Sequence, residues 1–149
     1  MDWKYEIVVS KMKGILLLSH GNMAKGMLQS ASIFFGDNIE QVEALDFQIT
    51  DDSDLFEEKI GEAIDRLDKG EGVIILTDLF GGTPAHKTTK YVKSGKIDVI
   101  CGMNFPIFLE LLGSRNNDDI NLDELMEIGK EGIKKWQIET SNSSDDDFF

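Results

Sequence analysis

The feature that most constrains the fold of this chain is a pair of unbroken aliphatic runs, each of which opens into polar residues and glycine. GILLLS (14–19) continues into HGN, and VIILT (73–77) continues into DLFGGTP. A strand that is apolar at every position needs cover on both faces, which is typical of a parallel sheet. The two runs therefore predict covered parallel strands whose polar ends open at the edge of the sheet where ligands bind.

Helical patterns alternate with such strands along the chain. The predicted strands are 14–19, 41–47, 73–77 and 97–103, and the predicted helices are 22–36, 51–70, a short segment from Pro84, and 105–115. Asp54 is the predicted N-cap of the second helix, and Glu57 completes a capping box with it. The alternation predicts an α/β fold, with a doubly wound, mostly parallel sheet of strand order 2-1-3-4 flanked by helices.

The two ends of the chain differ from its middle. We expect residues 1–12 to be an N-terminal extension, 13–138 a single domain, and 139–149 an acidic disordered tail that has little to bury. Within the domain, 122–128 follow a helical pattern, whereas 133–138 fit either a helix or a last strand. No apolar run reaches the roughly 20 residues of a membrane span, and the start of the chain does not resemble a secretion signal. We therefore expect a cytoplasmic protein.

Charge and cysteine content exclude several classes of function. The formal net charge is −13, and 118–149 alone carry ten acidic side chains against three lysines. Nucleic acid is bound by clustered basic side chains, so we expect no nucleic-acid partner. The single cysteine, Cys101, follows Val99 and Ile100 and is expected to be a buried strand residue rather than a reactive thiol. One cysteine and two distant histidines supply no spaced set of metal ligands, so we expect no metal.

His20 ends the first aliphatic run, and Asp78 follows the run at 73–77. In a sheet of order 2-1-3-4 these two strands are neighbours and the winding reverses between them, so the two side chains meet. A carboxylate that accepts the Nδ1–H of a histidine fixes its tautomer and leaves Nε2 with a free lone pair for attack on an electrophile. The competing interpretation is a structural, hydrogen-bonded histidine beside an aspartate that serves the turn.

The FGGTP turn after Asp78 favours the chemical interpretation. Gly81 and Gly82 let backbone amides approach a ligand closely, and Thr83 offers a hydroxyl, which together suit a phosphate. The two glycines also fit a tight strand-to-helix connection with no ligand. The sequence contains neither a nucleotide-binding glycine motif nor the G-x-S-x-G elbow of serine hydrolases. The remaining hypothesis is a histidine that itself carries a phosphoryl group, without a cofactor.

From about Lys13 to Trp136, the sequence resembles the enzyme IIA domain of the mannose-type (mannose, fructose and sorbose) bacterial sugar phosphotransferase system. The segments that carry the resemblance, in the order found in that family, are GILLLSHG, TDLFGGTP, VICGMNFPIFLELL and EGIKKW. The resemblance implies that His20 is transiently phosphorylated and that Asp78 hydrogen-bonds it. It also implies that the phosphate pocket is bordered by the residues after His20 and by the glycine turn; these residues are Asn22, Met23, Phe80, Gly81, Gly82, Thr83 and Pro84.

The resemblance implies partners as well. His20 would take a phosphoryl group from the phosphohistidine of a small histidine-containing phosphocarrier protein and pass it to enzyme IIB for sugar uptake and phosphorylation. Neither nucleotide nor metal takes part, and the membrane is involved only indirectly, through the sugar permease. The family forms homodimers in which a C-terminal antiparallel strand exchanges between subunits. In this chain that strand would be 133–138.

One position departs from the family pattern. The family has asparagine two residues after the proline of the turn, whereas this chain has His86, followed by Lys87 and Thr88 in place of small residues. We expect His86 to be an exposed helical residue, which leaves His20 as the carrier. Three other interpretations stay open: a regulatory protein-binding module of the same fold, the phosphotransfer subunit of a dihydroxyacetone kinase, and a binding domain that has lost phosphorylation.

Overall fold

The sheet predicted from the aliphatic runs is the centre of the protein. The computed structural model describes residues 12–93, 95–116 and 120–137. Four parallel strands form one sheet in the order β2-β1-β3-β4; their bounds are β1 Gly14–His20, β2 Val42–Phe47, β3 Val73–Thr77 and β4 Ile97–Cys101. This order confirms the predicted doubly wound α/β fold.

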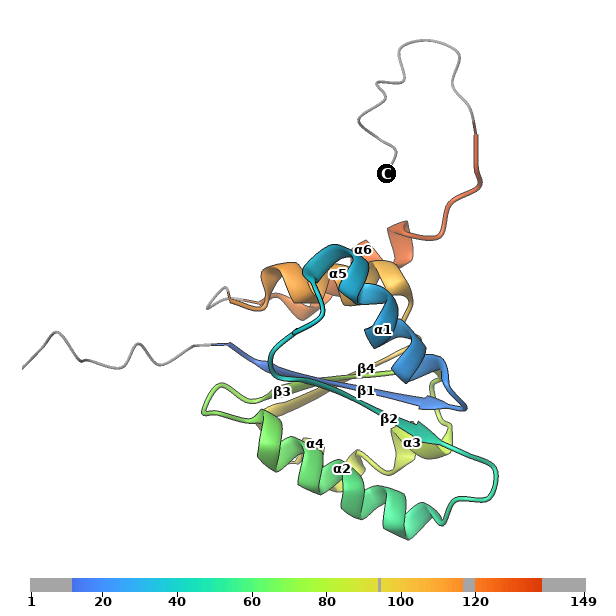
Figure 1. Cartoon of the computed structure of the whole chain (residues 1–149), viewed down its shortest axis with the longest axis vertical. Helices are drawn as coiled ribbons and strands as arrows, with labels where there is room; N and C mark the ends of the chain where they lie inside the picture. The colour runs from blue at the N-terminus through green and yellow to red at the C-terminus, as the bar shows by residue number, and fades with distance from the viewer. Residues whose placement is uncertain (1–11, 94, 117–119, 138–149) are drawn as a thin grey trace, which may run out of the picture.

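Helices cover both faces of the sheet, so the described chain has three layers (Figure 1). One face carries α1 (Met23–Phe35), α5 (Phe105–Ser114) and α6 (Leu122–Glu131), and the other carries α2 (Ser53–Leu67), α3 (Thr83–His86) and α4 (Thr89–Val92). β1 therefore leads into a helix on one face, and β3 leads into a helix on the opposite face. Among the described residues, no helix is both long and apolar enough to span a membrane.

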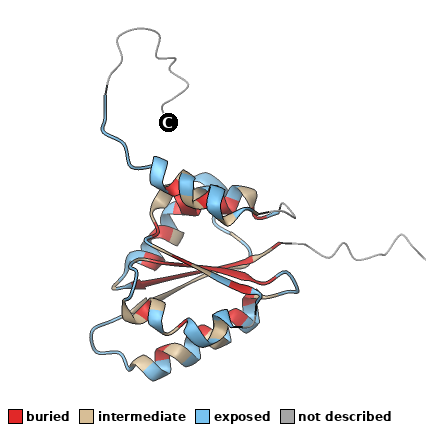
Figure 2. Ribbon diagram, turned by 180° about the vertical axis from the view of Figure 1, so that it is seen from behind, coloured by how far each residue is buried: buried red, intermediate tan, exposed pale blue. Residues whose placement is uncertain are grey.

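Strand β1 supplies both hydrophobic cores. Its side chains alternate, so that Ile15 and Leu17 pack in the core under α1 and α5, whereas Leu16 and Leu18 pack in the core over α2. All four are wholly buried, and burial of each such side chain stabilises the fold by about 1.5–3 kcal/mol. Figure 2 shows the same arrangement, with buried strands between helices whose outer sides are exposed. The cores hold β1 firmly and so fix the position of its last residue, His20.

The start of α2 differs from the prediction. Asp52, not Asp54, is the N-cap, because the Asp52 carboxylate accepts hydrogen bonds from the amides of Asp54 and Leu55 at 2.8 and 3.2 Å. The predicted capping box is therefore wrong, and Glu57 instead forms an ion pair with Lys90 at 3.1 Å. The pattern misled because several neighbouring aspartates suit an N-cap and only the backbone conformation selects one of them.

The end of β4 also differs from the prediction. The strand ends at Cys101 rather than at residue 103, because Gly102 has φ +84° and turns the chain towards α5. Cys101 is half-buried rather than buried, since β4 is an edge strand with a neighbour on one side only. After α6, residues 133–137 form neither helix nor strand in the single chain, so their exchange as a strand stays a prediction.

The predicted terminal segments lie mostly outside the described residues. Of the expected extension 1–12, only Met12 is described, and it is buried, with its carbonyl accepting a hydrogen bond from Gln41 Nε2 at 3.3 Å. Residue 138 and the expected acidic tail 139–149 lie outside the described residues.

Candidate active site

The candidate site lies at the carboxyl ends of β1 and β3. These two strands are hydrogen-bonded neighbours, and the chain leaves them towards opposite faces of the sheet (Figure 1). In doubly wound sheets the crevice outside such a switch point is where ligands bind. The Asp78 amide donates to the Leu18 carbonyl at 3.2 Å, which ties the end of β3 beside His20.

His20 and Asp78 are in direct contact, as the strand order predicts. The His20 Nδ1 atom lies 2.8 Å from Asp78 Oδ2, and the His20 amide donates to the same oxygen at 2.9 Å. The imidazole is 43% exposed, whereas the carboxylate is only 10% exposed. A carboxylate at Nδ1 keeps the ring proton on that nitrogen, so Nε2 is the nitrogen with a free lone pair.

Hydrogen bonds keep Asp78 ionised despite its burial. Burial on its own raises the pKa of the Asp78 carboxyl, but the His20 amide, the His20 ring and the Leu79 amide together outweigh it and hold the pKa below its ordinary value. The Leu79 amide donates to Oδ1 at 2.9 Å, so both carboxylate oxygens have a partner. An ionised Asp78 is suited to stabilise positive charge that develops on the imidazole.

Gly82 lies against the Cε1–Nε2 edge of the His20 imidazole. A Cβ atom added to Gly82 would be 2.6 Å from His20 Cε1 and 3.2 Å from His20 Nε2, so any larger residue would require the ring or the turn to shift. Gly81 before it has φ +84°, a conformation that favours glycine. Thr83 then begins α3, and Pro84 is its buried second residue. The glycine turn and the histidine are thus packed together rather than merely near one another in the fold.

The β1–α1 connection contains the residues predicted on the other side of His20. Gly21 has φ +58°, and its amide donates to the Phe47 carbonyl at 2.9 Å. Asn22 is exposed, with its side-chain oxygen accepting from Gln48 Nε2 at 2.8 Å, and Met23 is exposed at the first position of α1. These residues border His20 along the chain, but no hydrogen bond is formed between them and its ring in the described structure.

Two residues of the site were not predicted from the sequence. Ser19 is wholly buried, and its hydroxyl accepts a hydrogen bond from the Ala24 amide at 2.7 Å, which anchors the start of α1. Phe47 lies edge-on to the His20 ring, with centroids 6.4 Å apart, and packs in turn on Phe56. The sequence could have indicated Phe47, because it is the last residue of β2 and is in register with His20 on the neighbouring strand.

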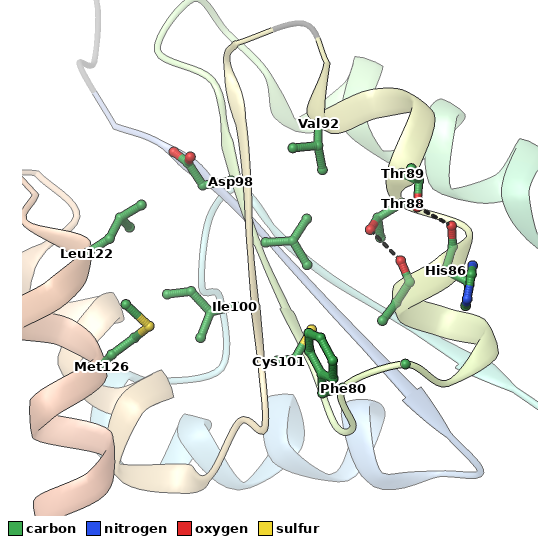
Figure 3. A pocket seen from close by; sticks show the side chains of 13 residues that line it. Phe80, His86, Thr88, Thr89, Val92, Asp98, Ile100, Cys101, Leu122 and Met126 are labelled. Atoms are coloured by element: carbon green, nitrogen blue, oxygen red, sulfur yellow. Dashed lines mark hydrogen bonds between the residues drawn. The ribbon is translucent and has the colours of Figure 1, made fainter.

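Phe80 is 92% exposed and borders, together with Gly81, a cavity of about 520 Å³ along the edge strand β4, which Figure 3 shows. His86 and Cys101 border the same cavity, and α6 contributes Leu122 and Met126. His86 is exposed, as predicted. Among the described residues, no group of three or more His, Cys, Asp or Glu side chains is arranged to hold a metal ion.

Fold and site together define a doubly wound α/β protein with a carboxylate-paired histidine at its switch point. Comparison with known proteins gives the family. The family model described as "PTS system fructose IIA component" matches residues 14–128. This chain therefore belongs to the mannose-type enzyme IIA family of the sugar phosphotransferase system, as the sequence motifs predicted.

Individual relatives agree with this assignment. The chain is 33% identical over 125 residues to the mannose-specific EIIAB component of Escherichia coli K12, in a match that covers 80% of this chain but 38% of the relative. It is 30% identical over 138 residues to the sorbose-specific EIIA component of Lacticaseibacillus casei, covering 90% of this chain and 99% of that one. The chain thus spans less than half of the E. coli relative and nearly all of the L. casei one.

A solved structure shares the fold at comparable identity. The PTS IIA protein associated with the fucose utilization operon of Streptococcus pneumoniae is similar with a TM-score of 0.77 and 31% identity, over 83% of this chain and 93% of that chain.

Proposed function

We propose that this protein is a phosphoryl carrier of a sugar phosphotransferase system and that His20 is the residue that carries the phosphoryl group. The observation that carries the proposal is the 2.8 Å contact between His20 Nδ1 and the buried Asp78 carboxylate, which leaves Nε2 free beside Gly82. Family membership supports the same conclusion, since the relatives are components of such systems.

The proposed reaction is a transfer between two histidines. The Nε2 lone pair of His20 attacks the phosphorus of the carrier's phosphohistidine in line, a new N–P bond forms, and the N–P bond to the carrier's histidine breaks. The proton stays on Nδ1, and Asp78 stabilises the positive charge that the ring gains. The reverse attack, by a histidine of enzyme IIB, removes the phosphoryl group. The step as written uses neither nucleotide nor metal.

Residues of the two flanking turns hold the transferring group in this proposal. The backbone amides of Gly81 and Gly82 and the hydroxyl of Thr83 would support its oxygens, and Pro84, which is buried near the start of α3, would hold the turn in place. On the opposite side, the exposed residues Asn22 and Met23 border the group. Phe80 would act at the rim rather than in this pocket, given its exposure beside β4.

Protein partners fit the surface around His20. Large apolar side chains are exposed in the connections and first helical turns that follow β1, β2 and β3: Met23, Ile49, Leu55, Leu79 and Phe80. Exposed apolar patches of this kind mark contact sites with other proteins. We assign this surface to the histidine-containing phosphocarrier protein and to enzyme IIB, in the cytoplasm, with the membrane reached only through the sugar permease.

The protein also fits a homodimer. Among the described residues, β4 has a hydrogen-bonded neighbour on one side only, and Ile133 and Trp136 are exposed in the segment after α6. Segment 133–138 would add to the β4 edge of a second copy, covering the cavity beside it. Sedimentation analysis tests this: the full chain should be a dimer and a chain truncated after residue 132 a monomer. A dimer that survives the truncation would contradict the exchange.

The decisive experiment is the intact mass of the protein after incubation with phosphoenolpyruvate, enzyme I and the phosphocarrier protein. One acid-labile phosphoryl group should appear on the native chain and on His86→Ala, and none on His20→Ala. A reaction without the phosphocarrier protein is the control. Absence of any mass gain in the native chain, or a gain that survives His20→Ala, would show that the fold is present without the proposed activity.

A further inference from the structure

Lys87 connects α3 to the first turn of α2. Its Nζ atom lies 3.0 Å from Asp54 Oδ1 and 3.9 Å from Glu57 Oε2. Its backbone amide donates to the Thr83 carbonyl at 3.0 Å, so the residue also closes α3. The Lys87 side chain is only 23% exposed, although Asp54 is 87% exposed. The ion pair thus joins two elements that are 33 residues apart in the sequence.

Other contacts between α2 and the α3–α4 segment lie further along the chain. Tyr91 on α4 donates its hydroxyl to the Glu57 carbonyl at 2.7 Å, and a Cβ on Gly61 would be 2.6 Å from that hydroxyl. Lys90 forms an ion pair with Glu57 at 3.1 Å. Of these contacts, the one made by Lys87 is nearest in sequence to the glycine turn.

The other end of α3 is the part that lies against the reactive histidine. The Gly82 carbonyl accepts from the His86 amide at 2.9 Å, and Gly82 itself is packed on the Cε1 and Nε2 atoms of His20. α3 has only four residues, of which Pro84 alone is buried, so its packing on β1 is limited. A shift of α3 relative to α2 therefore moves Gly82 relative to His20 Nε2.

We propose that Lys87 is a positioning residue for phosphoryl transfer: its ion pair with Asp54 fixes α3 on α2 and so holds the Gly82 turn at the Nε2 side of His20. The inference rests on the proposed role of His20 as phosphoryl acceptor. Because one partner of the pair is largely exposed, the pair adds little to the stability of the fold. Its effect falls on the alignment of the reacting atoms, to which transfer rates are sensitive.

The test is the rate of His20 phosphorylation over a range of phosphocarrier concentrations. Lys87→Met and Asp54→Asn should each lower kcat roughly fivefold at unchanged KM, and the double variant should be no slower than either single one. Lys87→Arg, which keeps the charge and the reach, should stay within about twofold of the native rate. Lys90→Met removes a lysine from the same layer without touching α3, and it should also stay within about twofold.

Three outcomes would overturn the inference. The single variants could transfer at the native rate, or KM could rise instead of kcat falling. In the third, the Lys87→Met variant is slow while the Asp54→Asn variant transfers at the native rate. The last would mean that Lys87 acts through Glu57, or directly on the phosphoryl group or the partner protein, rather than through Asp54. An amide NMR spectrum supplies a second readout that does not depend on transfer. The Gly82 resonance should move in Lys87→Met and Asp54→Asn and stay in Lys90→Met, with unchanged thermal unfolding; a Gly82 resonance that stays in the first two variants counts against the inference.

The native chain in the same assay separates this inference from the proposed function. If the native chain takes up no phosphoryl group, the role of His20 fails, whatever the variants do. If the native chain is phosphorylated on His20 and the Lys87 and Asp54 variants match it, only the positioning role fails.

Discussion

Strands β1 and β4 are both rich in aliphatic residues and lie in the same sheet, but they differ in strand pairing and in burial. β1 is paired on both sides, and its residues 15–18 are wholly buried. Within the described part of the chain β4 is paired with β3 alone, and of its five residues Ile97 and Ile100 are buried. The comparison teaches that His20 ends a strand enclosed on both sides, whereas β4 leaves one edge and most of its residues only partly covered.

The largest effect should come from the carboxylate that the end of β3 places beside His20. Asp78→Asn keeps the shape of the side chain but removes the charge that, in the proposed reaction, stabilises the imidazole as it attacks. We expect the rate of His20 phosphorylation to fall by about 10²–10³-fold. Rapid-quench kinetics of the reaction with phosphorylated carrier protein measure this rate.

The matched control for that variant is Asp98→Asn on the edge strand, where the carboxylate is exposed and lines the cavity beside β4. It should leave the rate within about twofold of native. Equal losses in the two variants would mean that Asp78 acts through overall charge rather than through its contact with the ring.

The second prediction tests the two strands themselves. Leu17→Ala removes a wholly buried side chain from the core under α1 and should lower the free energy of unfolding by about 2–5 kcal/mol. Val99→Ala on β4 removes a half-buried one and should cost about 1 kcal/mol or less. Denaturant titration followed by circular dichroism measures both. If the two losses were equal, the contrast between the central and the edge strand would not hold.

The third prediction concerns the glycine that touches the histidine. In Gly82→Ala the new Cβ would lie 2.6 Å from His20 Cε1, so either the ring or the turn must shift. We expect transfer to slow by about tenfold or more. Gly113→Ala is the matched control, because a Cβ there has nothing within 4 Å. A Gly82→Ala variant with native transfer and native stability would show that the contact with the ring is unimportant.

Sequence reasoning went furthest where one local pattern dominated. The runs at 14–19 and 73–77 are apolar throughout, so they predicted the strands, and the strand order then predicted that His20 and Asp78 meet, as they do at 2.8 Å. The edge strand was less well predicted, because the number of its neighbours decides the burial of Cys101 and no local pattern records that number.

The remaining details of the site depend on side chains that approach from distant parts of the chain. The contact of Gly82 with the ring and the pairing of Lys87 with Asp54 each join segments more than 30 residues apart, so spacing along the sequence carries no signal for them. The prediction of the N-cap of α2 was wrong for a different reason. Asp52 and Asp54 are chemically the same, and the choice between them is made by the backbone.

The smallest expected effect is the pH dependence of stability that Asp78 brings to the end of β3. Its pKa is lower in the folded protein than the ordinary value of 3.8, because hydrogen bonds from His20 and Leu79 outweigh the opposing effect of burial. The unfolded chain therefore binds the proton more readily. The stabilisation from ionised Asp78 is complete well above pH 3.8 and is lost as the pH falls through the lower, folded pKa.

Comparison of the native chain with Asp78→Asn isolates this contribution. The native chain should be more stable near pH 7, by about 1 kcal/mol for the loss of hydrogen bonds to a charged acceptor, and the difference should shrink steadily below about pH 4. Urea titrations at several pH values measure it. A difference that stays constant or grows towards acid would mean that Asp78 is not held ionised by its contacts. The negative charge that the proposed reaction requires beside the His20 imidazole would then have to come from another group.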